Sequence, residues 1–116
     1  RLNADWVVLS ACNTGAAEGN GGEAVSGLGR GFFFSGARSI LVSNWAVETV
    51  SARLLVTEAL RRYSGDQMVR RDQALRESML RLMDEMVAKD DSGRVQFSYA
   101  HPVFWAAFSL VGDGSR

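Results

Sequence analysis

The sequence predicts an α/β fold in which about three mostly parallel strands are flanked by three helices. Three short apolar runs, at residues 6–9, 38–43 and 104–111, carry few charges, as strands buried on both faces do. Segments between these runs have apolar residues at helical spacing, and glycines or polar residues separate the elements. Strands and helices that alternate in this way form a sheet with helices packed on its faces.

The composition allows one domain at most and excludes several kinds of partner. The chain has 116 residues, of which 47% are hydrophobic and 22% are charged, as in ordinary globular domains. The 13 basic residues balance the 13 acidic ones, so we expect no nucleic-acid partner. No apolar run approaches the roughly 20 residues of a membrane span, so we expect no membrane partner either. A single cysteine excludes an internal disulfide and fits a reducing compartment, so we expect a cytoplasmic protein.

The first predicted strand leads directly to Cys12, which is followed by a glycine-rich loop. The carboxyl ends of strands are where α/β folds place ligands and reacting groups. Backbone N–H groups of such a loop could stabilise an oxyanion. A lone cysteine is, however, more often a buried and inert side chain. These residues alone therefore leave two interpretations open for Cys12, a nucleophile or a structural thiol.

Residues 23–35 predict a helix, which Gly36 would end as a C-cap. Its glycines at alternate positions fit a close approach to a sheet. The second strand, residues 38–43, follows. A strand, a helix and a second strand in this order predict a right-handed parallel crossover. This arrangement would bring Asn44 and Trp45 to the same sheet edge as Cys12.

The second half of the chain predicts two further helices and the last strand. Apolar residues recur at helical spacing over residues 48–63, and again after Asp66, with a charged face opposite the second set. Methionines in the second set are typical of core filling. Residues 89–98 are expected to be a polar connector, and the apolar run at 104–111 is the third strand.

Other chemistry has weaker support in the sequence. His101 is the only histidine, and its place just before Pro102 and the third strand suits a structural role. It would lie at the sheet edge opposite Cys12 if that strand is parallel, whereas the two could share an edge if it is antiparallel. No cluster has metal-ligand spacing, so we expect neither a metal nor a cofactor. Residues 19–24 match the loose form of the dinucleotide fingerprint but do not follow the strand directly. A nucleotide-binding α/β domain remains an alternative.

Four segments together resemble the carboxy-terminal half of a CHAT domain, the caspase-like domain associated with tetratricopeptide repeats. They cover residues 7–15, 27–32, 36–47 and 101–114, in order and at suitable spacing. The resemblance implies a three-layer caspase-like sandwich, related to separases and gingipains, of which this chain holds part. It also implies a cysteine–histidine dyad that cleaves a protein or peptide substrate.

The same resemblance assigns candidate site residues. Cys12 matches the family's nucleophile, and its own N–H would contribute to the oxyanion hole, with Asn13 and Gly15 in the surrounding region. Asn44 and Trp45 correspond to a strand end that helps to form the substrate cleft. The family commonly has Trp-Pro-Val-Asp there, whereas this chain has Trp-Ala-Val-Glu at residues 45–48. The loss of the proline puts the rigidity of this loop in doubt.

One departure from the family is an absence. The family's catalytic histidine lies upstream of the cysteine strand, and no such position exists in this sequence. We therefore expect residues 1–116 to be the carboxy-terminal part of a single CHAT domain and to be nearly inactive alone. The exposed edge of the cysteine strand would be covered by the rest of the domain or by a second chain, such as another copy. A non-catalytic CHAT-type interaction module is the main alternative.

Overall fold

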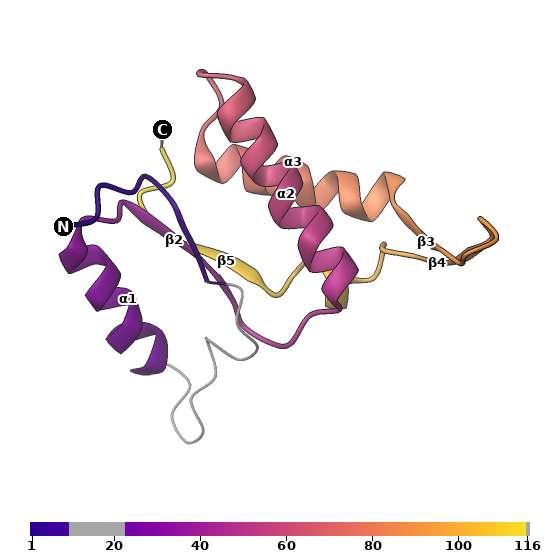
Figure 1. Ribbon diagram of the computed structural model, residues 1–116, viewed down its shortest axis with the longest axis horizontal. Coiled ribbons are helices and arrows are strands. Elements are labelled where there is room, and N and C mark those ends of the chain that lie inside the picture. The colour runs from indigo at the N-terminus through magenta and orange to yellow at the C-terminus, as the bar shows by residue number, and fades with distance from the viewer. Residues whose placement is uncertain (10–22, 116) are drawn as a thin grey trace. The chain divides into compact units, whose positions relative to one another are not determined.

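The computed structural model describes residues 1–9 and 23–115. The chain divides into two compact units, which are considered separately. Unit 1 consists of Arg1–Ala46 and Ala107–Arg116, and unit 2 of Val47–Ala106. Unit 2 is therefore an insertion between two segments of unit 1 (Figure 1).

Unit 1 is built on a three-stranded sheet in which the strands lie in the order β1-β2-β5. All five residues of the central strand β2 are buried, as a strand between two neighbours requires. β1 runs parallel to β2, so the parallel crossover predicted from the sequence is confirmed. The bounds of these elements are β1 Val7–Leu9, α1 Glu23–Ser35, β2 Ser39–Ser43 and β5 Phe108–Gly112.

The third strand differs from the sequence prediction in length and direction. β5 begins only at Phe108 and runs antiparallel to β2, with Ser43 opposite Phe108 and Ser39 opposite Gly112. The preceding residues form a short 3-10 helix, η1 (Pro102–Phe104), because Pro102 has no N–H to donate to a strand ladder. The chain leaves β2 at Ser43 and comes back beside Ser43 at Phe108, so β5 runs along β2 in the opposite direction. The sheet is mixed, not mostly parallel.

Glycines in and after α1 serve different purposes. Gly29 is buried, and a Cβ built on it would lie 3.8 Å from the Cδ1 of Ile40, in ordinary contact with β2. This agrees with the close approach predicted from the sequence, whereas Gly31 faces open space. Gly36 has a φ of +104°, and a Cβ there would collide with the backbone oxygen of Leu2. Gly36 therefore ends α1 as predicted.

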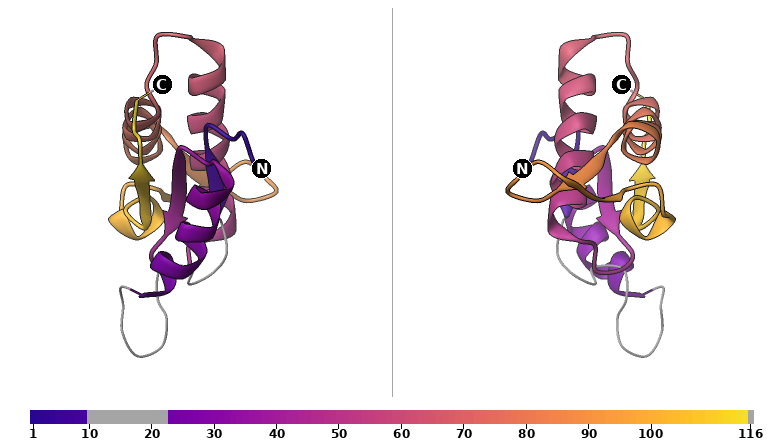
Figure 2. Two further views of the ribbon diagram at one scale, coloured as in Figure 1. Left: turned by 90° about the vertical axis from the view of Figure 1, so that its left-hand side faces the viewer. Right: turned by 90° about the vertical axis from the view of Figure 1, so that its right-hand side faces the viewer.

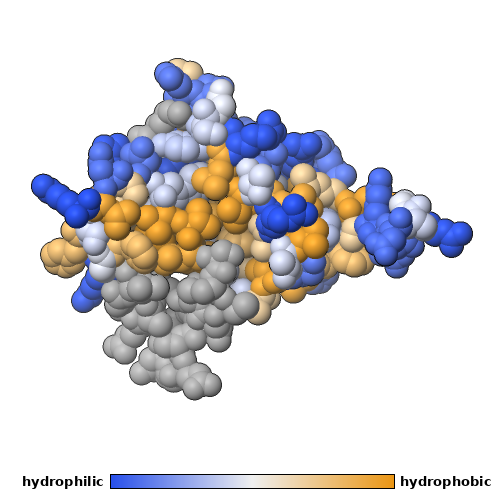
Figure 3. Space-filling view, viewed as in Figure 1, coloured by the Kyte–Doolittle hydropathy of each residue, from blue (hydrophilic) through white to orange (hydrophobic). Residues whose placement is uncertain are grey.

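β1 lies at an edge of the described sheet, and its three residues are only half-buried. The sequence predicted a strand buried on both faces. In the space-filling view, apolar side chains gather over the part of unit 1 that holds α1 and β1 (Figure 3). β1 therefore combines an apolar sequence with an edge position.

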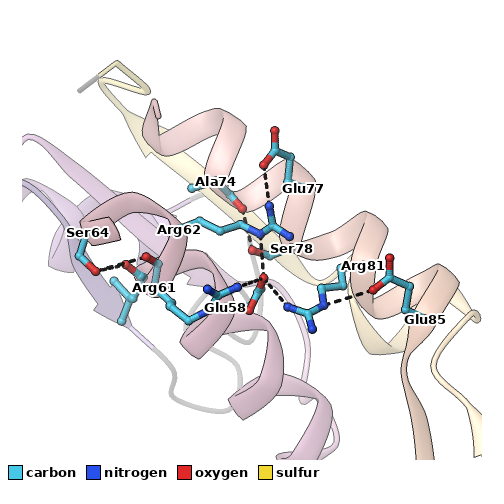
Figure 4. A network of polar contacts seen from close by, with 10 residues as sticks. Glu58, Arg61, Arg62, Ser64, Ala74, Glu77, Ser78, Arg81 and Glu85 are labelled. Carbon is cyan, nitrogen blue, oxygen red and sulfur yellow. Dashed lines mark hydrogen bonds and ion pairs between the residues drawn. The ribbon is translucent and has the colours of Figure 1, made fainter. Parts of the chain in front are cut away.

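Unit 2 contains two helices that pack against each other, α2 (Thr49–Gly65) and α3 (Arg71–Glu85) (Figures 1 and 2). A network of ion pairs centred on Glu58 joins them (Figure 4). The buried apolar side chains of the two helices are Leu55, Ala59, Ala74, Leu75 and Leu82.

Arg71 belongs to the charged face that the sequence predicted for α3, and charged side chains are mostly exposed. Its side chain is fully buried, with the guanidinium carbon 5.8 Å from the centre of the Tyr63 ring. One guanidinium nitrogen donates to the Tyr63 hydroxyl at 3.4 Å. Packing between helices has overridden the surface position that the charge pattern indicates.

The connector expected at residues 89–98 is instead a β-hairpin. Its strands are β3 (Val87–Lys89) and β4 (Val95–Ser98), which pair antiparallel. The Asp90 carboxylate accepts hydrogen bonds from the N–H groups of Ser92 and Arg94, and Gly93 has a φ of +84°. This aspartate and glycine chemistry is what a hairpin turn requires.

The described residues form three helices and five strands in two small sheets, apart from the 3-10 turn. The mixed α/β class predicted from the sequence is therefore confirmed. The arrangement is consistent with part of an α/β sandwich.

Candidate functional site

The carboxyl ends of β1 and β2 lie at the same edge of the sheet. Leu9, the last residue of β1, pairs with Val42, and β2 ends one residue later. Cys12 is the third residue after Leu9, and Asn44 directly follows β2. The strand that leads to the cysteine therefore lies beside the strand that leads to Asn44. Cys12, Asn13 and Gly15 themselves lie outside the described residues.

Asn44 is bound to the beginning of the β5 segment. Its backbone N–H donates to the Ala107 carbonyl at 2.7 Å. Its side-chain Nδ2 donates to the same carbonyl at 2.9 Å and to the Ser109 hydroxyl oxygen at 2.8 Å. The sequence predicted a cleft residue here. The donors of the carboxamide are directed into the sheet's own framework, so the side chain fixes the point at which β2 ends.

Trp45 follows at once and exposes 38% of its surface. It lies in the short connection, residues 44–48, that has neither helical nor strand structure. An exposed tryptophan presents a large apolar surface of a kind that is common in binding sites. The cleft position that the family resemblance implies for Trp45 stays a prediction.

Glu48 caps α2, although the sequence predicted that the helix begins with it. Its Oε1 accepts from the Val50 N–H at 3.0 Å, and its Oε2 accepts from the Ser51 N–H at 2.7 Å. The Ser51 hydroxyl donates to the Glu48 carbonyl at 2.9 Å. Partial burial raises the pKa of the Glu48 carboxyl, but the hydrogen bonds from Ser51 and Val50 outweigh it, so the pKa lies below its usual value.

Little in the sequence indicates that Glu48 is an N-cap. Asparagine, aspartate and serine are the usual N-cap residues, so a glutamate at this place reads as part of the helix. The available signal was the acidic side chain directly before the first turn, where the helix dipole favours negative charge.

His101, the only histidine, caps the 3-10 helix η1. Its Nδ1 accepts a hydrogen bond from the Val103 N–H at 3.1 Å. An accepting Nδ1 carries no proton, so this nitrogen is occupied in the local turn. The contact supports the structural role that the sequence favoured for His101.

Two further findings concern the described part of the chain. It contains no group of three or more histidine, cysteine, aspartate or glutamate side chains that could hold a metal ion. None of its helices has the length and apolar character needed to cross a membrane.

Comparison with known proteins identifies the family. The family model of the CHAT domain matches residues 1–113, which is nearly the whole chain. No curated protein and no solved structure matches it. CHAT domains are generally caspase-like and occur as modules of larger proteins. The chain belongs to the CHAT domain family.

Proposed function

We propose that this chain is part of a caspase-like cysteine endopeptidase in which Cys12 is the nucleophile. The observation that carries the proposal is the family match over residues 1–113. The parallel pairing of β1 with β2 supports it, because the residues that precede Cys12 and Asn44 end at one edge of the sheet. A cleft at this edge would be formed by a glycine-rich loop on one side and Trp45 on the other.

The chemistry follows that of other cysteine peptidases. A general base removes the proton of the Cys12 thiol, and the thiolate sulfur bonds to the carbonyl carbon of a peptide. Backbone N–H groups of Cys12 and its neighbours, the region of Asn13 and Gly15, would stabilise the oxyanion. The base returns its proton to the leaving amine, and water then hydrolyses the thioester.

The base in this proposal is a histidine outside the 116 residues. His101 is the only histidine of the chain, and its Nδ1 accepts from Val103 in a local turn. A missing general base lowers the rate by about 10²–10⁴-fold, so the chain alone should be nearly inactive. Residues 1–116 would then be the carboxy-terminal part of a single domain. A thiol that must stay reduced also fits a cytoplasmic protein.

A non-catalytic interaction module that keeps the CHAT fold is the second candidate. The local cap made by His101 favours it, because the Nδ1 of the only histidine in the sequence is engaged in the turn of η1. The two candidates differ in whether the thiol reacts with substrate-like molecules.

Covalent labelling separates the two candidates. The protein, with any sequence that precedes Arg1, is treated with peptidyl acyloxymethyl ketones that differ in the side chain next to the reactive group, and with iodoacetamide. We expect at least one peptidyl reagent to label Cys12 much faster than iodoacetamide does, with the adduct located by mass spectrometry. Cys12→Ser serves as the control. Equal, slow labelling by every reagent in a folded protein would favour the interaction module.

A further inference from the structure

The beginning of β2 holds both of its neighbours in the sheet of unit 1. The Arg38 N–H donates to the Ala4 carbonyl at 3.0 Å, and the Arg38 carbonyl accepts from the Asp113 N–H at 3.0 Å. The first of these bonds continues the pairing of β1 with β2 backwards, past Val7, which lies opposite Ile40. The segment before β1 is therefore attached to the turn between α1 and β2.

Ser39, the first residue of β2, adds a side-chain bond to this attachment. Its hydroxyl donates to the Asp5 carbonyl at 3.0 Å. The Ser39 side chain is fully buried, and every residue of β2 is buried, so the donor is held in place. The bond therefore joins a fixed point of the central strand to the segment that leads into β1.

A second side-chain contact at the same place is weaker. Arg38 and Asp5 form an ion pair at 3.3 Å, but their side chains are 56% and 57% exposed, so water and salt screen the pair. Gly36 contributes in another way, because a Cβ there would collide with the backbone oxygen of Leu2. The Ser39 hydroxyl is therefore the shielded side-chain contact of this junction.

β1 depends on such contacts more than a central strand does. It has three residues, which are half-buried, and in the described sheet it pairs only with β2. Cys12, the proposed nucleophile, follows Leu9 by three residues. A nucleophile that is displaced by about 1 Å can lose about 100-fold in rate, so the strand before it must be held firmly.

We propose that Ser39 is a positioning residue, whose buried hydroxyl fixes the start of β1 on β2 and thereby the strand that leads to Cys12. The proposal rests on the proposed function. Ser39 lies at the amino end of β2, whereas β1 leads to Cys12 from its carboxyl end, so Ser39 acts only through β1. Its loss should therefore lower kcat and leave KM nearly unchanged.

The test compares variants of the protein with any sequence that precedes Arg1. In Ser39→Ala we expect kcat for a cleaved peptide to fall about tenfold, which corresponds to about 1.4 kcal/mol, with KM nearly unchanged. Ser78→Ala is the matched control, because it also removes a buried serine hydroxyl, bonded to the Ala74 carbonyl at 2.7 Å within α3, and it should leave kcat unchanged. Arg38→Gln removes only the exposed ion pair and should lower kcat much less than Ser39→Ala does.

The labelling rate of Cys12 gives a readout that a loss of stability alone would not reproduce. A peptidyl acyloxymethyl ketone needs an oriented thiol and should label Ser39→Ala about tenfold more slowly than the unaltered protein. Iodoacetamide needs only an accessible thiol and should label both at similar rates, whereas partial unfolding would accelerate its reaction.

Amide hydrogen exchange tests the anchor without activity. Exchange at Val7–Leu9 should accelerate in Ser39→Ala and stay unchanged in Ser78→Ala. Unchanged kcat in Ser39→Ala, or an equal fall in Ser78→Ala, would overturn the positioning role. Absence of turnover and of peptidyl labelling in the unaltered protein would contradict the proposed function, and with it the positioning of Cys12. Unchanged exchange at Val7–Leu9 in Ser39→Ala would overturn the anchor of β1 itself.

Discussion

Glu58 is a nearly buried carboxylate that is surrounded by cations. Its side chain is only 8% exposed and accepts hydrogen bonds at 2.8 Å from each of Arg61, Arg62 and Arg81 (Figure 4). The hydrogen bonds from Arg61 are the largest cause that lowers its pKa to about 2, and Arg81 adds to the effect against the opposing influence of burial. Glu58 lies on α2 and Arg81 lies on α3, so the ion pair between them links the two helices.

The stability of the protein should depend on pH through Glu58. The folded-state pKa of about 2 lies below the ordinary value of 4.5, so the stabilisation is present above pH 4.5 and is lost as the pH falls toward 2. A shift of this size corresponds to about 3 kcal/mol at most. Near pH 7, Glu58→Gln should therefore lower the free energy of unfolding by about 1–3 kcal/mol.

Urea unfolding near pH 7 and near pH 3 measures this effect. The difference between the unaltered protein and Glu58→Gln should shrink at the lower pH. Arg70→Gln, which removes an exposed ion pair with Asp72, is the matched control and should have little effect at either pH. A difference that is the same at both pH values would contradict the assignment of charge to Glu58.

At the residue scale, the sequence identified Asn44 as a candidate site residue but not its contacts. Asn44 and its partners Ala107 and Ser109 are separated by more than sixty residues. Only the antiparallel return of β5 brings them together. The burial of Arg71 was missed for a similar reason, since the neighbouring helix creates it.

At the scale of elements, the features that follow from local sequence or from the order of the elements were predictable. Features that depend on distant segments of the chain were not. The bounds of α1 agree with the prediction because apolar spacing and Gly36 are both local signals. The parallel pairing of β1 and β2 follows from the order strand, helix, strand, because a crossover helix joins parallel strands. The direction of β5 depends on how unit 2 returns the chain, which no local pattern encodes.

Gly112 tests the packing between β5 and α1. Its φ is +102°, and a Cβ would lie 2.7 Å from the Arg38 carbonyl oxygen and 2.9 Å from the Phe33 ring. Gly112→Ala should lower the free energy of unfolding by about 2 kcal/mol or more, from both strain and collision.

Gly93→Ala is the matched control in this experiment. Gly93 also has a positive φ, of +84°, but a Cβ there meets nothing within 4 Å. Gly93→Ala should therefore lower the free energy of unfolding by only about 1–2 kcal/mol, which is the cost of the backbone strain. Thermal unfolding of both variants measures the difference, and equal losses would mean that the Phe33 and Arg38 contacts do not matter.

At the scale of the whole molecule, β1 is an apolar strand with a hydrogen-bonded neighbour on only one side in the described sheet. Its apolar residues are half-buried, and it lies at an edge of the described sheet. Edges of this kind pair with further strands. Both partners expected from the sequence, the rest of the domain or a second chain, would add a strand there.

Sedimentation of the 116-residue chain tests this expectation. We expect a dimer or a larger assembly, because β1 of one copy can pair with an edge of another. The protein with any sequence that precedes Arg1 is the comparison, and its added strand should prevent the association. A chain of 116 residues that remains monomeric at all concentrations would contradict the open edge.

Cleavage of peptides by the protein, with any sequence that precedes Arg1, tests the central claim most directly. The rate is measured over a peptide library for the unaltered protein, for Cys12→Ala and for residues 1–116 alone. The account predicts turnover that Cys12→Ala abolishes, and a rate about 10²–10⁴-fold lower for residues 1–116 alone. Turnover that survives in Cys12→Ala, or its absence in every form of the folded protein, would contradict the role of Cys12 as the nucleophile.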